Sequence, residues 1–202
     1  MRKIKAKYEN DIDNFFIEIS EILSPYFKKL NMTANDITTL SLIFGLISIY
    51  YLYIDSYNYS ALFYLISHLF DVMDGYYARK YKITSKFGDL YDHFKDIIVG
   101  ILLYSLLIYK IYYHNSDYLI YYLIIIIVSF INMNIYLGCQ ENISNKNKKI
   151  NNHDENFLDF HKYLCKNNPK QKIQFFKYFG CGSFILIISL LIISIQFICH
   201  KN

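Results

Sequence analysis

Long apolar blocks separated by short polar connections dominate the pattern of this chain. Four blocks approach the roughly 20 residues that a helix needs to cross a bilayer, and they cover residues 37–54, 97–113, 118–137 and 178–199. A fifth block, 59–70, is long enough if its helix continues through the acidic residues that follow it. A sixth span would have to lie within 157–179, where Pro169 and several lysines interrupt the apolar residues, so this region is predicted to be cytosolic or interfacial. The pattern predicts an all-α, polytopic membrane helix bundle of five to six transmembrane helices.

A different pattern precedes the first block. Between Ile12 and Leu30, apolar residues recur at helical spacing with glutamates and lysines between them. Such a helix is too polar to cross the membrane but is suited to lie in the membrane–water interface. A soluble helix packed on its own chain fits the same pattern, and the two interpretations can hold together. We therefore expect residues 1–33 to form an N-terminal interfacial or cytosolic segment with one amphipathic helix.

Lysine and arginine are unevenly distributed among the connections. They gather before the first block, in the turn 79–86 and along 139–177, whereas 55–60 and 114–117 contain none. Cytosolic loops of membrane proteins carry the excess of basic residues. The N-terminal segment, the turn 79–86 and the loop 139–177 are therefore predicted to be cytosolic. The 202 residues are expected to form one membrane domain, 1–202, and the net charge of +4 gives no reason to expect a nucleic-acid partner.

The four cysteines show no spacing typical of a metal site. Cys139, Cys165, Cys181 and Cys199 contain no CxxC pair, and two of them fall at or in an apolar block. We therefore predict free thiols rather than a disulfide framework or a zinc site.

Residues 71–96 place a dense group of charges between two apolar blocks. If 60–80 and 85–112 form antiparallel helices joined near Ile83, two aspartates of the first helix lie at the same depths as two of the second. On each helix the two aspartates are three or four residues apart and so share one face. The sequence predicts a box of four carboxylates just inside the cytosolic interface, formed by Asp71, Asp74, Asp92 and Asp96.

Four carboxylates this close repel one another unless cations neutralise them. Oxygen ligands at this charge density suit hard divalent ions such as Mg²⁺ or Mn²⁺, and two ions fit four carboxylates, as in enzymes that act at phosphorus. Gly75 and Gly88 leave space on the carboxylate face, and Arg79 stands at the rim, where its guanidinium suits a diphosphate. Asp89 is expected to be solvated at the start of its helix. His68, one turn before Asp71, could support that carboxylate, but a partly buried structural histidine is the favoured interpretation. Acidic clusters also occur in the ion pathways of transporters, and this alternative stays open at this point.

The spacing of these residues resembles that of a known family. The pattern Asp71-x2-Asp74-Gly75-x2-Ala78-Arg79-x8-Gly88-x3-Asp92-x3-Asp96 resembles the complete signature of the CDP-alcohol phosphatidyltransferases. Upstream, Asn35 and Thr38 resemble the family's Asn-x-x-Thr element, with Ala34 where a proline is frequent. Ion conduction has no need of the Gly and Ala-Arg positions, so the resemblance favours an enzyme over an intramembrane divalent-ion transporter.

The resemblance implies a transferase of phospholipid biosynthesis. A CDP-linked alcohol would donate its substituted phosphoryl group to an acceptor hydroxyl, and CMP would leave. Asp71, Asp74 and Asp92 would hold two divalent metal ions, Mg²⁺ or Mn²⁺. Asp96 would ligate a metal or accept the proton of the acceptor as general base. Substrate-binding roles would fall to Asn35, Gly75, Ala78, Arg79 and Gly88. The resemblance also implies a homodimer among membrane lipids, with its active site facing the cytosol.

Two substrate arrangements occur within such a family. In one, CDP-diacylglycerol donates to a small polar alcohol; in the other, CDP-choline or CDP-ethanolamine donates to diacylglycerol, as in the aminoalcohol phosphotransferases. The short chain with few spans resembles the first arrangement, whereas the Asp92-His93 pair resembles the second. We favour CDP-diacylglycerol as the donor and keep the second arrangement as the alternative.

Overall fold

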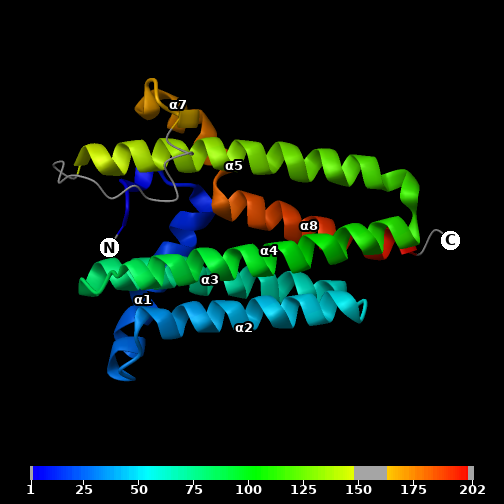
Figure 1. Ribbon diagram of the computed structural model, residues 1–202, viewed down its shortest axis with the longest axis horizontal. Helices are drawn as coiled ribbons and strands as arrows, with labels where there is room; N and C mark the ends of the chain where they lie inside the picture. Colours follow the sequence, from blue (N-terminus) through cyan, green and yellow to red (C-terminus); the bar gives the residue numbers. More distant parts are fainter. Residues whose placement is uncertain (1, 148–162, 200–202) are drawn as a thin grey trace.

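The protein is a bundle of long helices with shorter ones gathered at one end (Figure 1). The computed structural model describes residues 2–147 and 163–199, and these contain helices and connections but no strand. The helices are α1 (Asp11–Lys29), α2 (Ala34–Tyr53), α3 (Tyr57–Tyr81), α4 (Lys86–His114), α5 (Leu119–Asn147), α7 (Pro169–Phe176) and α8 (Cys181–Cys199). Three short 3₁₀ helices are η1 (Ala6–Tyr8), η2 (Ser116–Tyr118) and η3 (Lys177–Phe179). The predicted all-α bundle is confirmed.

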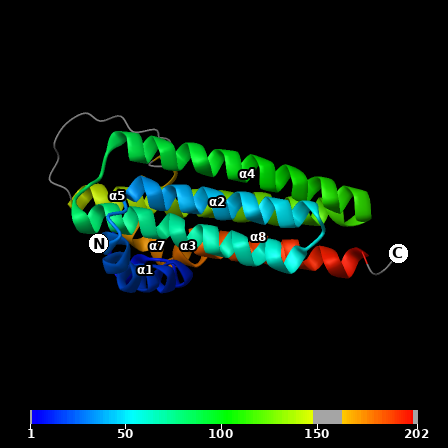
Figure 2. The ribbon, with the colours of Figure 1, turned by 90° about the horizontal axis from the view of Figure 1, so that it is seen from below.

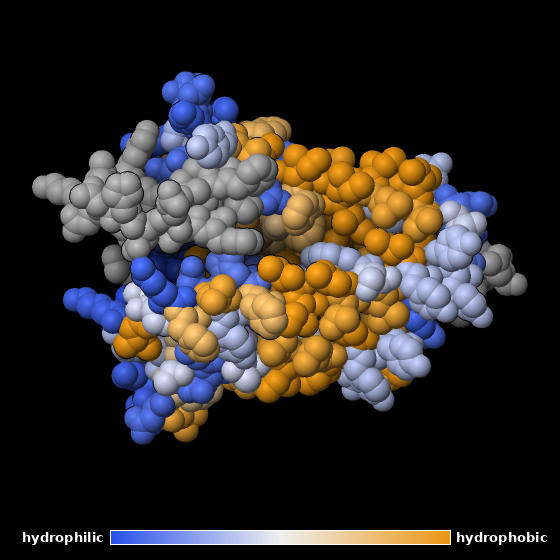
Figure 3. Space-filling view, viewed as in Figure 1, coloured by the Kyte–Doolittle hydropathy of each residue, from blue (hydrophilic) through white to orange (hydrophobic). Residues whose placement is uncertain are grey.

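Within the described residues, three segments are long and apolar enough to cross a membrane: α2, the stretch Ser116–Ser144 within η2 and α5, and the stretch Pro169–Ile198 that contains α8. On the face shown in Figure 3, apolar side chains form a belt across the middle, and hydrophilic side chains gather at the end where α1 and α7 lie. The structure is that of a membrane protein. α3 and α4 have 25 and 29 residues, sufficient length to cross, but they carry the charged stretch, so their crossing stays a prediction.

The region 157–179, which could hold a sixth span but is predicted to be cytosolic or interfacial, falls partly outside the described residues. Its described part contains α7, which has eight residues, and the three-residue η3. Eight residues of helix cannot cross a bilayer. The described part of 157–179 therefore does not form a membrane span of its own, in agreement with the prediction that this region is cytosolic or interfacial.

Local capping determines where the helices around the charged stretch begin and end. Thr33 and Asp36 form a capping box at the start of α2, in which each side chain accepts from the backbone N–H of the other. α3 ends at Lys82, which has the left-handed backbone conformation with φ of 56°. Ser85 then caps α4 by accepting from the N–H of Gly88 at 3.0 Å. The tight turn predicted near Ile83 is therefore present.

Small residues allow α2 to pack closely against α3 and α4 (Figure 2). Ser41 Oγ donates to the carbonyl of Ser67 at 2.9 Å, and Ser67 Oγ donates to the carbonyl of Ser41 at 2.8 Å. On the α4 side, a Cβ at Gly45 would lie 3.0 Å from both methyl groups of Val99. Small residues and short hydroxyl hydrogen bonds are typical of close helix contacts in membranes. This packing holds α2 in a defined register against α3 and α4, the two helices that carry the charged stretch.

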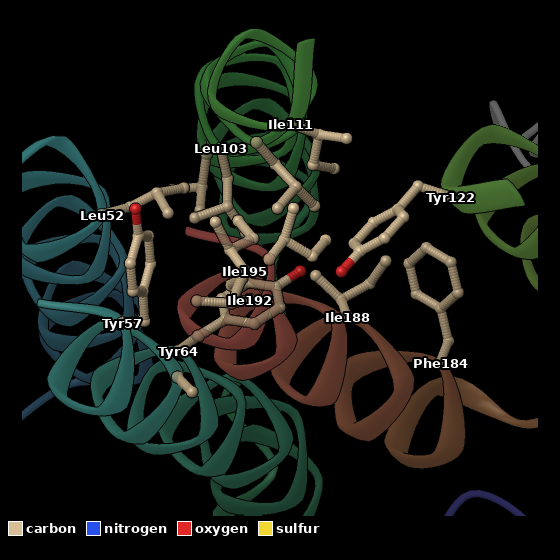
Figure 4. Packing of buried hydrophobic residues seen from close by; sticks show 14 residues of the cluster. Leu52, Tyr57, Tyr64, Leu103, Ile111, Tyr122, Phe184, Ile188, Ile192 and Ile195 are labelled. Atoms are coloured by element: carbon tan, nitrogen blue, oxygen red, sulfur yellow. The ribbon is translucent and has the colours of Figure 1, made fainter. Parts of the chain in front are cut away.

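α8 forms the centre of the main hydrophobic core (Figure 4). Its residues Ile188, Ile192 and Ile195 have no exposed surface and point toward α3 and α4 in this close-up. Leu103 of α4 and Tyr64 of α3 pack against the same cluster. The last helix in the sequence therefore lies among helices that precede it by about 100 residues, and it fixes their spacing.

α1 has one face packed on the bundle and another exposed. Ile17 is buried on the inner face, whereas Phe15, Ile22 and Tyr26 are 60%, 67% and 60% exposed. A polar helix that exposes large apolar side chains is suited to the membrane–water interface. The predicted amphipathic helix is present and packs on its own chain, and its place in the membrane–water interface stays a prediction.

The N-terminal segment is anchored to α5 and α8 by buried polar residues. Tyr136 Oη donates to Glu9 Oε1 at 2.5 Å, and Gln140 Nε2 donates to the same oxygen at 2.9 Å. Burial raises the pKa of Glu9 above its ordinary value, although both hydrogen bonds act in the opposite direction. Asn10 Nδ2 donates to the carbonyl of Lys177 at 2.5 Å and to Ser183 Oγ at 2.8 Å. The segment is therefore part of the bundle rather than an independent arm.

The prediction of free thiols is wrong for two cysteines. Cys139 and Cys165 form a disulfide, with their Cα atoms 5.0 Å apart. α5 continues into the predicted loop as far as Asn147, and the segment before α7 lies against it, so residues 26 positions apart meet. Sequence spacing alone does not reveal this approach. Cys181 is a free thiol, and the side chain of Cys199 lies outside the described part of the chain.

The contact of α8 with α1 predicts an effect on stability. A Cβ at Gly182 would lie 2.7 Å from Asp13 Oδ1 and 2.8 Å from Ile12 Cγ2, so Gly182→Ala forces the two helices apart. We expect a loss of about 1–3 kcal/mol in the free energy of unfolding, seen as a lower midpoint of thermal unfolding in detergent. Gly100→Ala is the control, because its Cβ would meet Tyr104 at an ordinary 3.4 Å. Equal midpoints for both variants would contradict the close packing of α1 on α8.

Candidate functional site

The four predicted carboxylates lie together at the end of the bundle that carries the 82–85 turn. Asp71 and Asp74 belong to α3, and Asp92 and Asp96 to α4. Oxygens of Asp71, Asp74 and Asp92 all lie within 4.8 Å of one another. Asp96 joins them through a shared cation, described below. Side-chain exposure rises from 27% at Asp71 to 59% at Asp96, so the cluster is open on the Asp96 side.

α2 holds the most deeply buried of the four aspartates. Thr38 Oγ1 donates to Asp74 Oδ2 at 2.7 Å, and the Asp74 residue is 6% exposed. Ile37 of α2 packs in one buried cluster with Met73 and Tyr77 on either side of Asp74 along α3. Thr38 was noted in the sequence only as part of the Asn-x-x-Thr element. The structure gives it a contact, because it orients the carboxylate of Asp74 toward the cluster.

Lys95 is the main residue that the sequence analysis missed. Its side chain is 2% exposed, and its Nζ lies 2.8 Å from Asp96 Oδ1 and 3.1 Å from Asp92 Oδ1. The same ammonium donates hydrogen bonds to Asp71 Oδ1 and, at 3.2 Å, to Ser41 Oγ. Its position in the sequence could have indicated this role, because Lys95 lies one helical turn after Asp92 and directly before Asp96. The sequence analysis treated it only as one of several charged residues in 71–96.

Arg79 and Asn35 lie beside the two motif glycines. A Cβ at Gly75 would lie 3.1 Å from Arg79 Nη1, and a Cβ at Gly88 would lie 3.0 Å from Asn35 Oδ1. The guanidinium therefore lies over Gly75, and Asn35 of α2 reaches across to α4. The space that the glycines leave is used by these two polar side chains. Ala78 precedes Arg79 on α3 and is half-buried.

The other charged or titratable residues near the site lie outside the cluster of carboxylates. Asp89 is exposed in the first turn of α4. His93 Nδ1 lies 2.7 Å from the carbonyl of Asp89, within its own helix. His68 is buried, with Nε2 3.0 Å from Asp13 Oδ1 and Nδ1 3.9 Å from Asp71 Oδ2. Asp13 of α1 has no signal in the motif, yet it links the N-terminal helix to the site through His68.

An apolar cavity of about 460 Å³ adjoins the cluster at Asp71 and Asp96. Side chains of α3, α4, α5 and α8 line it, and Asp71, Lys95 and Asp96 form its polar end. Tyr64 and Tyr104 also line it, and their hydroxyl groups lie 3.1 Å apart. A cavity with an apolar body and a charged end suits a lipid whose reactive group lies at its polar end.

The residues present fit a divalent metal ion. Three carboxylate oxygens that converge within 4.8 Å are hard ligands of the kind that Mg²⁺ and Mn²⁺ prefer. Asp92 Oδ1 is buried and accepts no hydrogen bond from any described residue, although the Lys95 ammonium lies 3.1 Å away. A buried carboxylate oxygen in this state has lone pairs available for a cation. Asp71, Asp74 and Asp92 would hold such an ion.

Comparison with known proteins agrees with the motif. The sequence model of a family described as CDP-alcohol phosphatidyltransferase matches residues 31–199, which include α2 through α8 and all nine predicted site residues. Searches of curated proteins and of solved structures found no match to this chain. A match over most of the chain, centred on a site with the expected geometry, shows that the protein belongs to the CDP-alcohol phosphatidyltransferase family.

Proposed function

We propose that the protein is a phosphotransferase of phospholipid biosynthesis that moves a substituted phosphoryl group from CDP-diacylglycerol to the hydroxyl of a small polar alcohol and releases CMP. Family membership implies phosphatidyl transfer from a CDP-alcohol. The observation that carries the proposal is the convergence of Asp71, Asp74 and Asp92, with their oxygens within 4.8 Å, on the two helices of the motif. An ion pathway would leave the placement of Arg79 and Asn35 beside this cluster without a purpose.

Asp71, Asp74 and Asp92 hold the metal in this proposal. A bound Mg²⁺ or Mn²⁺ would stabilise the negative charge that develops on the phosphates during transfer. The family resemblance implies two ions, the second beside Asp96. That second position coincides with the place of the Lys95 ammonium.

The side chains around the cluster bind the two substrates and move one proton. Arg79, above Gly75, offers a planar fork of donors to the diphosphate of the donor. Gly88 and Ala78 line the donor site with Asn35. Asp96 is the most exposed carboxylate and accepts the proton of the acceptor hydroxyl as the new oxygen–phosphorus bond forms and the bond to CMP breaks.

The apolar cavity supports a lipid on one side of the reaction. Its charged end at Asp71 and Asp96 would place a lipid headgroup next to the carboxylates. The alternative, transfer from CDP-choline or CDP-ethanolamine to diacylglycerol, was suggested by His93. His93 Nδ1 lies against the backbone carbonyl of Asp89 in its own helix. The short chain with few long helices favours the first arrangement.

The proposal includes an arrangement in the membrane. The five long helices α2, α3, α4, α5 and α8 would cross the bilayer, and the basic end with the carboxylates would face the cytosol. Residues 1–33 would lie in the interface on that side, with the basic residues of 139–177 nearby. By resemblance to the family, the chain would act as a homodimer.

The first prediction concerns the reaction and its metal. Purified protein in lipid-containing detergent, given CDP-diacylglycerol, a panel of small polar alcohols and Mg²⁺ or Mn²⁺, is expected to release CMP. EDTA should abolish the release, and excess Mn²⁺ should restore it, because the carboxylates alone cannot stabilise the charge on the phosphates. Chromatography of labelled nucleotide measures the product.

Other donors separate the alternatives. Phosphatidylcholine formed from CDP-choline and diacylglycerol, with no CMP from CDP-diacylglycerol, would reverse the choice of donor within the family. Absence of CMP from every donor under both metals, combined with metal flux across vesicles, would replace the enzyme with a transporter.

The second prediction separates metal binding from proton transfer. Asn in place of Asp71, Asp74 or Asp92 removes a charged ligand and should weaken Mn²⁺ binding and activity together. Asp96→Asn should lower turnover roughly 10²–10⁴-fold, the usual contribution of a general base, with little change in Mn²⁺ affinity. Isothermal titration and CMP release measure the two quantities.

Asp89→Asn is the matched control for this series. Asp89 is exposed on α4, one helical turn before Asp92 and His93, so its loss should leave both quantities unchanged. If Asp89→Asn were as damaging as Asp92→Asn while Asp96→Asn stayed active, the assigned roles would be wrong.

The third prediction concerns Thr38 as a positioning residue. Thr38→Val keeps the shape of the side chain and removes the hydrogen bond to Asp74, which should cost about 10–100-fold in Mn²⁺ affinity. Thr38→Ser keeps the hydroxyl and should retain the affinity. A loss of thermal stability without a loss of Mn²⁺ affinity in Thr38→Val would mean that Thr38 acts only in packing.

A further inference from the structure

The ammonium of Lys95 lies at the point where three carboxylates converge. Oδ1 atoms of Asp71, Asp92 and Asp96 all face Nζ, the last two at 3.1 and 2.8 Å. A second ion beside Asp96 would use these three carboxylates, and it would share Asp71 and Asp92 with the ion held at Asp74. A second ion bound to the same three oxygens would have to occupy the place of the ammonium.

Distance makes simultaneous occupancy unfavourable. An Mg²⁺ ion lies about 2.1 Å from its ligand oxygens, so an ion on these carboxylates would lie within about 5 Å of the Lys95 nitrogen. Repulsion between two cations at this separation opposes binding of the second ion. Lys95 and one divalent ion also already offset three of the four negative charges of the aspartates.

The carboxylates hold Lys95 in place. Its side chain is 2% exposed, and its ammonium is held between α3 and α4 and by Ser41 of α2. Val99, one turn further along α4, is buried against Gly45 and closes that side. Moving the ammonium away would leave a buried charge without its partners, which is costly.

The first metal position is compatible with Lys95. Asp74 makes no ion pair with the lysine, and its Oδ2 atom is held by Thr38 instead. Each carboxylate has two oxygens and about four lone-pair directions, so Asp71 and Asp92 can face both the ammonium and one ion. The lysine therefore occupies all three carboxylates that the second ion would use, whereas the first ion keeps Asp74 and the remaining lone pairs of Asp71 and Asp92.

We propose that Lys95 takes the place of the second divalent ion, so that this chain binds one divalent ion between Asp71, Asp74 and Asp92 and uses the lysine as a built-in cation at Asp96. The inference rests on the proposed function only in taking these aspartates as metal ligands. Lys95 then keeps Asp96 oriented beside the cavity and neutralises charge there without metal.

The experiment counts bound metal in the absence of any CDP-alcohol. Mn²⁺ is titrated into purified protein, and the electron paramagnetic resonance signal gives both the stoichiometry and the spin coupling of ions about 4 Å apart. Wild-type protein is expected to bind about one Mn²⁺ per chain without coupling. Lys95→Met removes the charge at nearly constant length and should bind about two, with a coupled signal. Lys82→Met, which alters an exposed lysine in the turn after α3, is the control and should bind as the wild type does.

Each outcome decides the inference. Two coupled ions in the wild type, or a single ion in Lys95→Met, would overturn it. If Lys95→Met does not fold, Lys95→Gln supplies the neutral variant, and the wild-type stoichiometry decides in any case. Protein that binds one Mn²⁺ but releases no CMP would refute the proposed function and leave the role of Lys95 standing.

Discussion

Four carboxylates placed close together beside an apolar core require cations, and this requirement explains how the surrounding helices are arranged. α3 and α4 each supply two aspartates, and the capped turn between them keeps the two pairs at the same depth. α2 supplies the hydroxyl of Thr38 to the most buried of them, and α4 supplies the ammonium of Lys95 to the other three. Without these contacts the cluster would take up protons or lose its compact form.

The packing around the site serves the same electrostatic requirement. Serines and Gly45 bring α2 close enough to α3 and α4 for Thr38 and Ser41 to reach the charged groups. α1 reaches the cluster from outside through the contact of Asp13 with His68, which lies next to Asp71. α8, the most apolar of the helices, fills the centre and forms one wall of the cavity. The site is therefore polar where nucleotide would bind and apolar where lipid would bind.

A second ion pair lies at the opposite end of the bundle. Lys110 Nζ lies 2.6 Å from Asp55 Oδ1 and donates to the carbonyl of Tyr53 at 2.8 Å. Partial burial of Asp55 raises its pKa, but hydrogen bonds from Lys110 and Tyr57 outweigh this effect and hold the pKa below its ordinary value. Lys110 is a basic residue that the sequence places near the side predicted to face away from the cytosol. Its charge is balanced locally, so it does not oppose the predicted orientation.

The sequence alone determined the features that depend on periodicity along one chain. Apolar runs predicted the long helices, helical spacing predicted the amphipathic α1, and the intervals between aspartates predicted that four carboxylates would meet across the 82–85 turn. These predictions succeeded because helix geometry converts sequence separation directly into position when two helices are joined by a short turn.

Only the tertiary structure decided which residues from distant helices complete the site. The contact of Thr38 with Asp74 and that of Asp13 with His68 join residues 36 and 55 positions apart, and the Cys139–Cys165 disulfide depends on a segment that returns to α5. Lys95 lies within the motif itself, but its direction relative to Asp71 depends on how α3 and α4 pack. Packing between helices is set by the summed fit of many side chains, which no local pattern of spacing records.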